Sequence, residues 1–274
     1  MRVAQVGKGT PEIAVLAGVH GDEPCGVRAV DRMLEEDLPV ARPVKFVVAN
    51  ERALKREVRY VDEDLNRAFP ADPNASSHEG RLANDLSAEL EGCLTLSMHS
   101  TKSYGEPFAI VPSVTNDSLD LCSQLPVTSV VEAGDIVEGR LFTETETIEV
   151  ECGLQGSDSA TENAYVVSRA FLAAVGALPG ESVPQPPPFS EESLSRPKSL
   201  PVYRLETPIR KERADQYEVF VENFERVEAG DCFAAADDTH HVADEPFYPV
   251  LLSPDGYRDV FGYAAQLIDT RPST

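Results

Sequence analysis

The chain has 274 residues, of which 42% are hydrophobic, so it can bury the core of one large α/β domain or of a medium domain with a smaller one. Its 47 acidic residues against 24 basic ones give a formal net charge of −23, which argues against duplex nucleic acid as a partner because DNA affinity depends on clustered basic side chains. The N-terminus lacks the pattern of a signal peptide, and no apolar run approaches the ~20 residues that span a bilayer. We therefore expect a soluble, cytoplasmic protein without a membrane partner.

The acidic residues are spread along the chain instead of being gathered in one tail. Such an excess suits either solubility in concentrated salt or a surface for a basic partner. A binding patch would be local, so the pattern favours the first interpretation and a halophilic source. The five cysteines are odd in number, irregularly spaced and without a CxxC pair, which predicts free thiols in a reducing compartment.

Strands and helices alternate along the first two-thirds of the chain. Near-continuous apolar runs predict strands buried on both faces, and apolar residues three or four apart predict helices. The expected strands are 12–19, 44–50, 93–99, 107–113, 129–134 and 147–153, and the expected helices are 23–37, 76–92, 116–124 and 163–175. This alternation predicts an α/β fold with a mostly parallel or mixed sheet covered by helices on both faces.

The composition changes after this region. Residues 178–201 are rich in Pro, Ser and Glu, which favours an extended linker or a surface excursion. Short β-like runs with turns follow. We therefore predict an α/β domain at 1–180, a Pro-rich linker or insertion at 181–201, and a small β domain at 202–274.

Two histidines end apolar strands. His20 and Glu23 follow the first expected strand, with Gly21 between them to allow a sharp turn, and His99 ends the third. In an open α/β sheet, ligands bind beyond the carboxyl ends of the strands, and a hydrolytic zinc site takes three protein ligands. These residues form either a metal site of two histidines and one carboxylate or a set of polar residues at strand ends.

The stretch RYVDEDLNRAFP, 59–70, combines four polar residues that suit substrate binding. Arg59 and Arg67 offer planar donors for a carboxylate or an oxyanion, and Asn66 can share such a carboxylate. Asp64 could orient a metal-bound histidine from behind. The alternative is a solvated charged loop with a local Asp64–Arg67 ion pair.

Taken together, these motifs resemble a known family. His20-x-x-Glu23, Asp64-Leu65-Asn66-Arg67 and His99 resemble the zinc carboxypeptidase superfamily. The stretches GVHGDE, RYVDEDLNRAFP, MHST and VECG resemble more specifically the succinylglutamate desuccinylase/aspartoacylase family, and VEAGDCFAAAD and FYPVLLSPDGY resemble its small β domain. The resemblance implies a zinc-carboxypeptidase-like mixed sheet flanked by helices, with 1–180 as the zinc-binding catalytic domain.

The resemblance also implies a metal and a base. One Zn²⁺ per chain would be held by His20, Glu23 and His99, and Glu151 would act as general base toward the zinc-bound water. Glu149 is the rival base, because it lies two residues away on the same face of the expected strand. The glycine that follows the Glu-x pair favours Glu151.

Substrate contacts follow from the same resemblance. Arg59 would polarise the scissile carbonyl and hold the oxyanion, while Asn66 and Arg67 would bind a substrate carboxylate. Asp64 would support a metal ligand from behind. Tyr257, in the expected β domain, falls near a family tyrosine that contacts substrate.

The basic residues around this loop suggest how an acidic chain could admit an anion. The window 50–67 holds five bases and five acids, so it is locally neutral. We predict that Arg52, Lys55 and Arg56 help to form a relatively positive mouth for carboxylates.

The predicted function is a zinc-dependent hydrolase that cleaves the amide bond of a small anionic N-acyl amino acid. The first alternative is a zinc carboxypeptidase, whose general base usually lies further along the chain from the last histidine than Glu151 lies from His99. The second is a metal-binding scaffold without activity. The acyl group, the amino acid and the formation of a homo-oligomer stay open.

Overall fold

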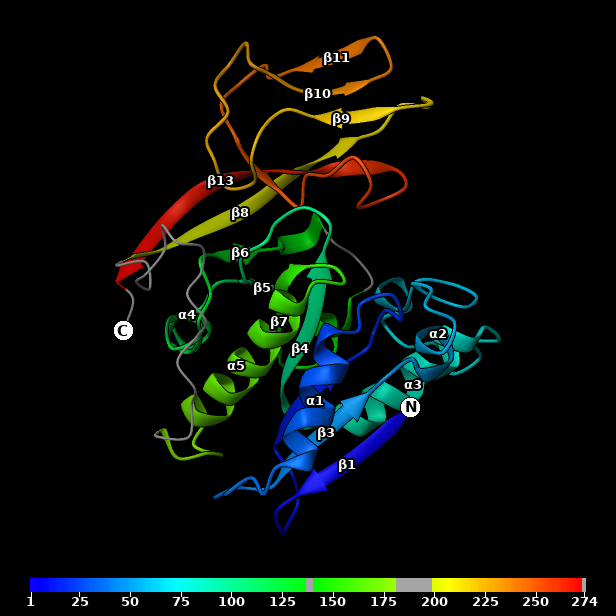
Figure 1. Cartoon of the computed structure of the whole chain (residues 1–274), viewed down its shortest axis with the longest axis vertical. Helices are drawn as coiled ribbons and strands as arrows, with labels where there is room; N and C mark the ends of the chain where they lie inside the picture. Colours follow the sequence, from blue (N-terminus) through cyan, green and yellow to red (C-terminus); the bar gives the residue numbers. More distant parts are fainter. Residues whose placement is uncertain (137–139, 181–198, 273–274) are drawn as a thin grey trace.

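A ten-stranded mixed sheet runs through the protein (Figure 1). The computed structural model describes residues 1–136, 140–180 and 199–272, so most of the predicted Pro-rich linker lies outside the described residues. The strand order is β1-β3-β2-β4-β7-β5-β6-β8-β13-β12. The strands are β1 (Arg2–Val6), β2 (Ile13–Ala17), β3 (Val44–Val48), β4 (Leu94–Thr101), β5 (Phe108–Val111), β6 (Val130–Glu132), β7 (Thr147–Leu154), β8 (Ser199–Arg210), β12 (Tyr248–Val250) and β13 (Val260–Pro272).

A separate three-stranded antiparallel sheet lies near the C-terminus, at the top of Figure 1. It consists of β9 (Tyr217–Val219), β10 (Cys232–Ala236) and β11 (Thr239–Val242). The predicted fold class, a mixed sheet flanked by helices with a small C-terminal β part, is confirmed. Because β8, β12 and β13 join the large sheet, β structure is continuous across the predicted boundary, and the exact division into domains stays a prediction.

Five α-helices and three short 3₁₀ helices accompany the strands in the described ranges. They are α1 (Cys25–Glu35), α2 (Glu51–Leu54), α3 (His78–Leu90), α4 (Asn116–Ser123), α5 (Asp158–Ala174), η1 (Leu65–Arg67), η2 (Gly134–Ile136) and η3 (Leu141–Thr143). Helix α5 begins before the predicted 163–175 because the Ser157 side chain accepts a hydrogen bond from the Ala160 amide and caps it there.

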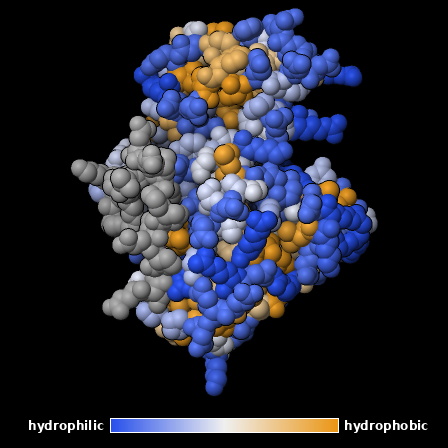
Figure 2. Space-filling view, viewed as in Figure 1, coloured by the Kyte–Doolittle hydropathy of each residue, from blue (hydrophilic) through white to orange (hydrophobic). Residues whose placement is uncertain are grey.

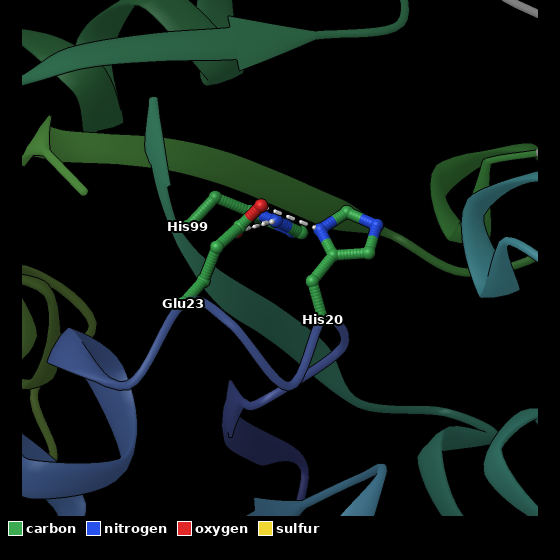
Figure 3. Close-up of side chains that lie close together, drawn as sticks. All are labelled: His20, Glu23 and His99. Atoms are coloured by element: carbon green, nitrogen blue, oxygen red, sulfur yellow. Dashed lines mark hydrogen bonds and ion pairs between the residues drawn. The ribbon is translucent and has the colours of Figure 1, made fainter. Parts of the chain in front are cut away.

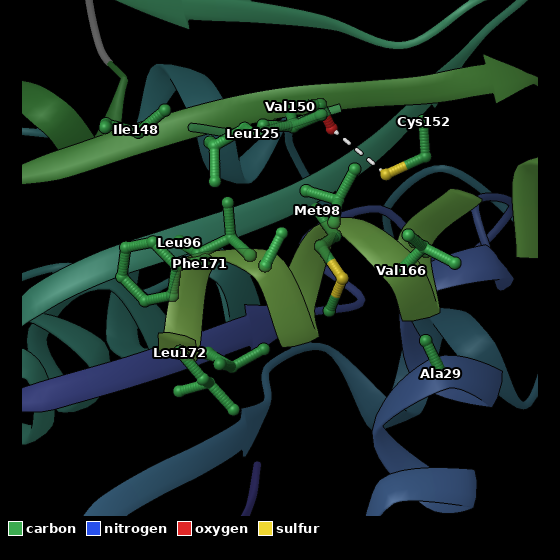
Figure 4. Packing of buried hydrophobic residues seen from close by; sticks show 14 of the residues in the cluster. Ala29, Leu96, Met98, Leu125, Ile148, Val150, Cys152, Val166, Phe171 and Leu172 are labelled. Atoms are coloured by element: carbon green, nitrogen blue, oxygen red, sulfur yellow. Dashed lines mark hydrogen bonds between the residues drawn. The ribbon is translucent and has the colours of Figure 1, made fainter. Parts of the chain in front are cut away.

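The β2 strand is apolar along its whole length because helices cover both of its faces. Val15 and Ala17 pack in the core with α1, α4 and α5, whereas Ala14 and Leu16 pack in a second core with α3. Figure 4 shows α5 packing against the sheet in the first of these cores, where Phe171 is fully buried. Strand β1 was not predicted, because it is an edge strand with half-exposed residues.

The surface on the viewed side of Figure 2 is largely hydrophilic. Hydrophilic side chains cover much of the visible face, with a large apolar area at the top of the view and smaller ones lower down (Figure 2). Within the described residues, no helix combines the length and the apolarity that crossing a bilayer requires.

A buried carboxylate holds the loop that leads from α2 to η1. Glu79, in the first turn of α3, is fully buried. Its carboxylate accepts hydrogen bonds from the amides of Val61 (2.7 Å), Asp62 (3.0 Å) and Glu63 (3.3 Å), and from Asn50 Nδ2 (2.9 Å). Burial opposes ionisation, but these donors outweigh it and hold the pKa of Glu79 below its ordinary value. The ionised side chain therefore fixes the backbone of this loop.

Replacing Glu79 by glutamine should weaken this clamp in a pH-dependent way. We expect Glu79→Gln to lower the free energy of unfolding of the metal-free protein by about 1–3 kcal/mol near neutral pH. Since the pKa is lowered in the folded state, the wild-type advantage exists above the ordinary glutamate pKa and shrinks as pH falls through about 4. Urea unfolding of wild type and variant, near neutral pH and below about pH 4, measures this difference in the free energy of unfolding. Exposed Glu35→Gln is the control, and an equal loss in both variants would contradict the clamp.

Candidate active site

Three buried side chains converge at the carboxyl end of the central strands (Figure 3). His20 and Glu23 lie in the turn between β2 and α1, and His99 lies in β4, the neighbour of β2. One ligand atom from each residue lies within 4.8 Å of the other two. The residues predicted to hold a metal are thus brought together.

The contacts of the two imidazole rings suit a metal ion. His20 Nδ1 lies 2.8 Å and His99 Nδ1 lies 3.1 Å from the carboxylate of Glu23. The other ring nitrogens, both Nε2, lie 3.1 Å from Asp64 Oδ1 and from Ser97 Oγ, respectively. Metal-binding histidines are held in this way, with one nitrogen turned to the ion and the other hydrogen-bonded behind. Two imidazoles and one carboxylate are a donor set that fits Zn²⁺.

Gly21 is required by close packing. A side chain at this position would collide with the backbone of Ala53 and Leu54 in α2, and the Gly21 amide donates to the carbonyl of Arg59 at 3.2 Å. Gly21 is not among the residues with positive φ. The expected sharp turn is present, but glycine is needed there because the turn lies directly on α2.

Arg59 and Asp64 link the stretch 59–67 to the predicted metal ligands. Arg59 Nη1 lies 3.0 Å from Glu23 Oε1, and Arg59 Nε lies 3.0 Å from Asp64 Oδ2. Asp64 Oδ1 contacts His20 Nε2 and also accepts the Asn66 amide at 2.9 Å, which starts η1. Burial opposes ionisation of Asp64, but its contacts with His20 and Arg59 hold its pKa below the ordinary value. The stretch 59–67 is therefore an organised part of the site.

Glu151 lies beside His99. The two residues are register partners on the parallel strands β7 and β4. Glu151 is 8% exposed, and burial raises its pKa to about 7, a value that suits a group that both takes and returns a proton. Its Oε2 has no hydrogen-bond partner among the described residues. The rival, Glu149, is bound to Arg140 and does not line the cavity described next.

A single cavity brings most of the predicted site together. Eight of the predicted residues line it: His20, Glu23, Arg59, Asn66, Arg67, His99, Glu151 and Tyr257. Asp64 does not line the cavity but contacts His20 and Arg59 from behind. Tyr257 comes from the segment between β12 and β13, whose backbone carbonyls accept hydrogen bonds from Lys211 Nζ. Burial raises the pKa of Tyr257, which keeps the phenol neutral.

Lys102, Arg140 and Gln155 also line the cavity and were not predicted as site residues. Lys102 lies three residues after His99, so its position next to a predicted metal ligand was a signal in the sequence. Arg140 lies only nine residues before Glu149 in the chain, but no periodic pattern in the sequence around it indicates that it lines the cavity.

The predicted positive mouth is wrong in its residues. Arg52, Lys55 and Arg56, on α2 and the turn after it, do not line the cavity. Its basic residues are Arg59, Arg67, Lys102 and Arg140, which come from three separate parts of the chain.

Comparisons with known proteins agree with this geometry. Residues 9–111 match the family described as the succinylglutamate desuccinylase/aspartoacylase catalytic domain. The chain is 32% identical over 92 residues to the succinylglutamate desuccinylase of Vibrio cholerae serotype O1, which covers 32% of this chain and 27% of that protein. It is 40% identical over 63 residues to the aspartoacylase of Xenopus tropicalis, which covers 22% and 20%. The matched region thus spans about a quarter or less of the length of these relatives.

Solved structures share the fold over nearly the whole chain. The succinylglutamate desuccinylase/aspartoacylase from Rhodobacter sphaeroides has a TM-score of 0.78 at 17% identity and covers 97% of this chain and 88% of its own. Murine aminoacylase 3 has a TM-score of 0.71 at 20% identity and covers 97% and 99%. The family resemblance of the motifs is confirmed for residues 9–111, which match the catalytic-domain model of the succinylglutamate desuccinylase/aspartoacylase family.

Proposed function

We propose that this protein is a zinc-dependent hydrolase that cleaves the amide bond of an N-acyl amino acid. One observation carries the proposal. A buried group of two histidines and a carboxylate adjoins a buried glutamate, Glu151, whose Oε2 has no hydrogen-bond partner among the described residues. The relatives that this chain resembles support it, since they include desuccinylases, aspartoacylases and an N-acyl-aromatic-L-amino acid amidohydrolase.

His20, Glu23 and His99 would hold the metal. A zinc ion bound there supplies Lewis acidity toward the scissile carbonyl and the attacking water. Glu151 takes a proton from that water and delivers it to the amide nitrogen as the carbon–nitrogen bond breaks, which yields a carboxylate and a free amine. The raised pKa of Glu151 suits both halves of this transfer.

The basic side chains of the cavity would bind and orient the substrate. Arg59 donates to the carbonyl oxygen as negative charge develops on it, while its contact with Asp64 keeps the guanidinium in place. Asn66 and Arg67 bind the carboxylate of the amino acid, and Tyr257, from the segment between β12 and β13, also contacts the substrate.

The metal assignment is tested by metal content. We expect wild-type protein to retain about one zinc ion per chain after dialysis. His99→Asn removes a ligand and should reduce the zinc content at least about tenfold. His240→Asn, in exposed β11, is the matched control and should retain full occupancy. Elemental analysis by mass spectrometry measures both, and an unchanged zinc content in His99→Asn would remove His99 from the site.

The base assignment is tested by turnover. We expect Glu151→Gln to lower kcat by about 10²–10⁴-fold while zinc content is preserved, because only the proton transfer is lost. Glu146→Gln, exposed just before β7, is the control. The assay is release of free amine from N-acetyl and N-succinyl amino acids in concentrated salt, with peptides alongside. Full turnover by Glu151→Gln contradicts its role, and release of C-terminal residues from peptides alone would favour a carboxypeptidase.

A further inference from the structure

A buried ion pair forms part of the wall of the active-site cavity. Arg140, 5% exposed, lines the cavity, and Glu149, 1% exposed, binds it through Oε2. Glu149 lies in β7 two residues before Glu151, so the two side chains point to the same face of the strand. The guanidinium therefore reaches the cavity with an anion directly behind it.

Arg140 acts on the groups of the site. Burial raises the pKa of both Glu151 and Tyr257, and the positive charge of Arg140 opposes that rise in each case. Because Arg140 lines the cavity, its positive charge also acts on a ligand bound there. Glu149 Oε1 has no hydrogen-bond partner among the described residues, so its negative charge is not dispersed over other donors there.

Stability alone gives no reason for this pair. Taking two charges out of water is costly, and a buried ion pair is often no more stabilising than apolar side chains of the same volume. A ligand carboxylate that approaches Arg140 meets a guanidinium already neutralised, and it is repelled by Glu149. Arg59 is likewise held by the carboxylates of Glu23 and Asp64.

We propose that Glu149 is a specificity-determining residue that neutralises Arg140 and thereby restricts the site to N-acyl amino acids carrying a single carboxylate. This inference rests on the proposed function and names its substrate class. A ligand with a second carboxylate, on the acyl group or on the amino acid, is disfavoured by the paired anion in the wall.

The test compares ligands of equal size that differ by one charge. The compounds are N-acetyl-L-asparagine, with one carboxylate, and N-acetyl-L-aspartate, with two; N-succinamoyl- and N-succinyl-L-alanine make the same comparison on the acyl side. Preference is measured on the zinc-loaded protein as the ratio of kcat/KM where the compounds are hydrolysed. Where they are not, it is measured as the ratio of Kd by calorimetry.

The wild-type protein should prefer the compounds with one carboxylate. Glu149→Gln should shift the ratio toward the dicarboxylates by about tenfold or more, because Glu149 then no longer neutralises the guanidinium. Replacing both residues, Arg140→Gln with Glu149→Gln, should abolish that gain. The control is Glu132→Gln, since Glu132 also pairs with an arginine, Arg204, but does not line the cavity.

A purely structural pair would give a different result. The melting temperature of Glu149→Gln would then fall, while its ratio of kcat/KM or Kd between the two classes of compound stayed within about twofold of wild type. This outcome overturns the proposal. If that variant does not fold, the wild-type ratio decides, because a preference for dicarboxylates overturns the proposal without any substitution. Failure to bind either class overturns it too. Absence of amide hydrolysis with a measurable binding preference would instead refute only the proposed function.

Discussion

The site depends on the carboxylate of Glu23. Its two oxygens contact His20, His99 and Arg59, so one buried anion joins the turn after β2, the strand β4 and the loop after α2. Burial disfavours the charged form, but the neighbouring His20 and His99 hold the pKa of Glu23 well below its ordinary value. Three segments distant in sequence are thus tied together at the point where a metal ion would be held.

The surrounding packing brings these segments to that point. The turn that carries His20 lies directly on α2 because position 21 is glycine. Glu79 fixes the loop that carries Arg59 and Asp64 by accepting three of its backbone amides. Parallel pairing of β4 with β7 sets Glu151 beside His99. Each support is a backbone constraint, which positions side chains more firmly than contacts between flexible side chains would.

The electrostatics of the cavity differ from those of the whole chain. The protein carries a formal charge of −23, yet the cavity wall holds four basic residues, two of them bound to buried or partly buried carboxylates. An anionic ligand is therefore attracted only at short range, where the arrangement of each cation with its partner decides how many carboxylates can bind. Such local pairing is a means of discrimination that total charge does not provide.

The sequence alone determined the features that depend on neighbouring residues. The apolar period located the main strands and helices, and His20 and Glu23 lie close enough along the chain to share one ligand set. The tertiary structure alone decided what depends on packing between segments. Edge strand β1 has too little apolar character to be recognised, and the bases on α2 turn out to lie outside the cavity. Glu149 and Glu151 share one strand face and look alike in sequence, but only the return of Arg140 to that face separates a paired anion from a candidate base. The physical reason is that strand periodicity specifies a face, whereas the charge that meets that face comes from a residue outside the strand.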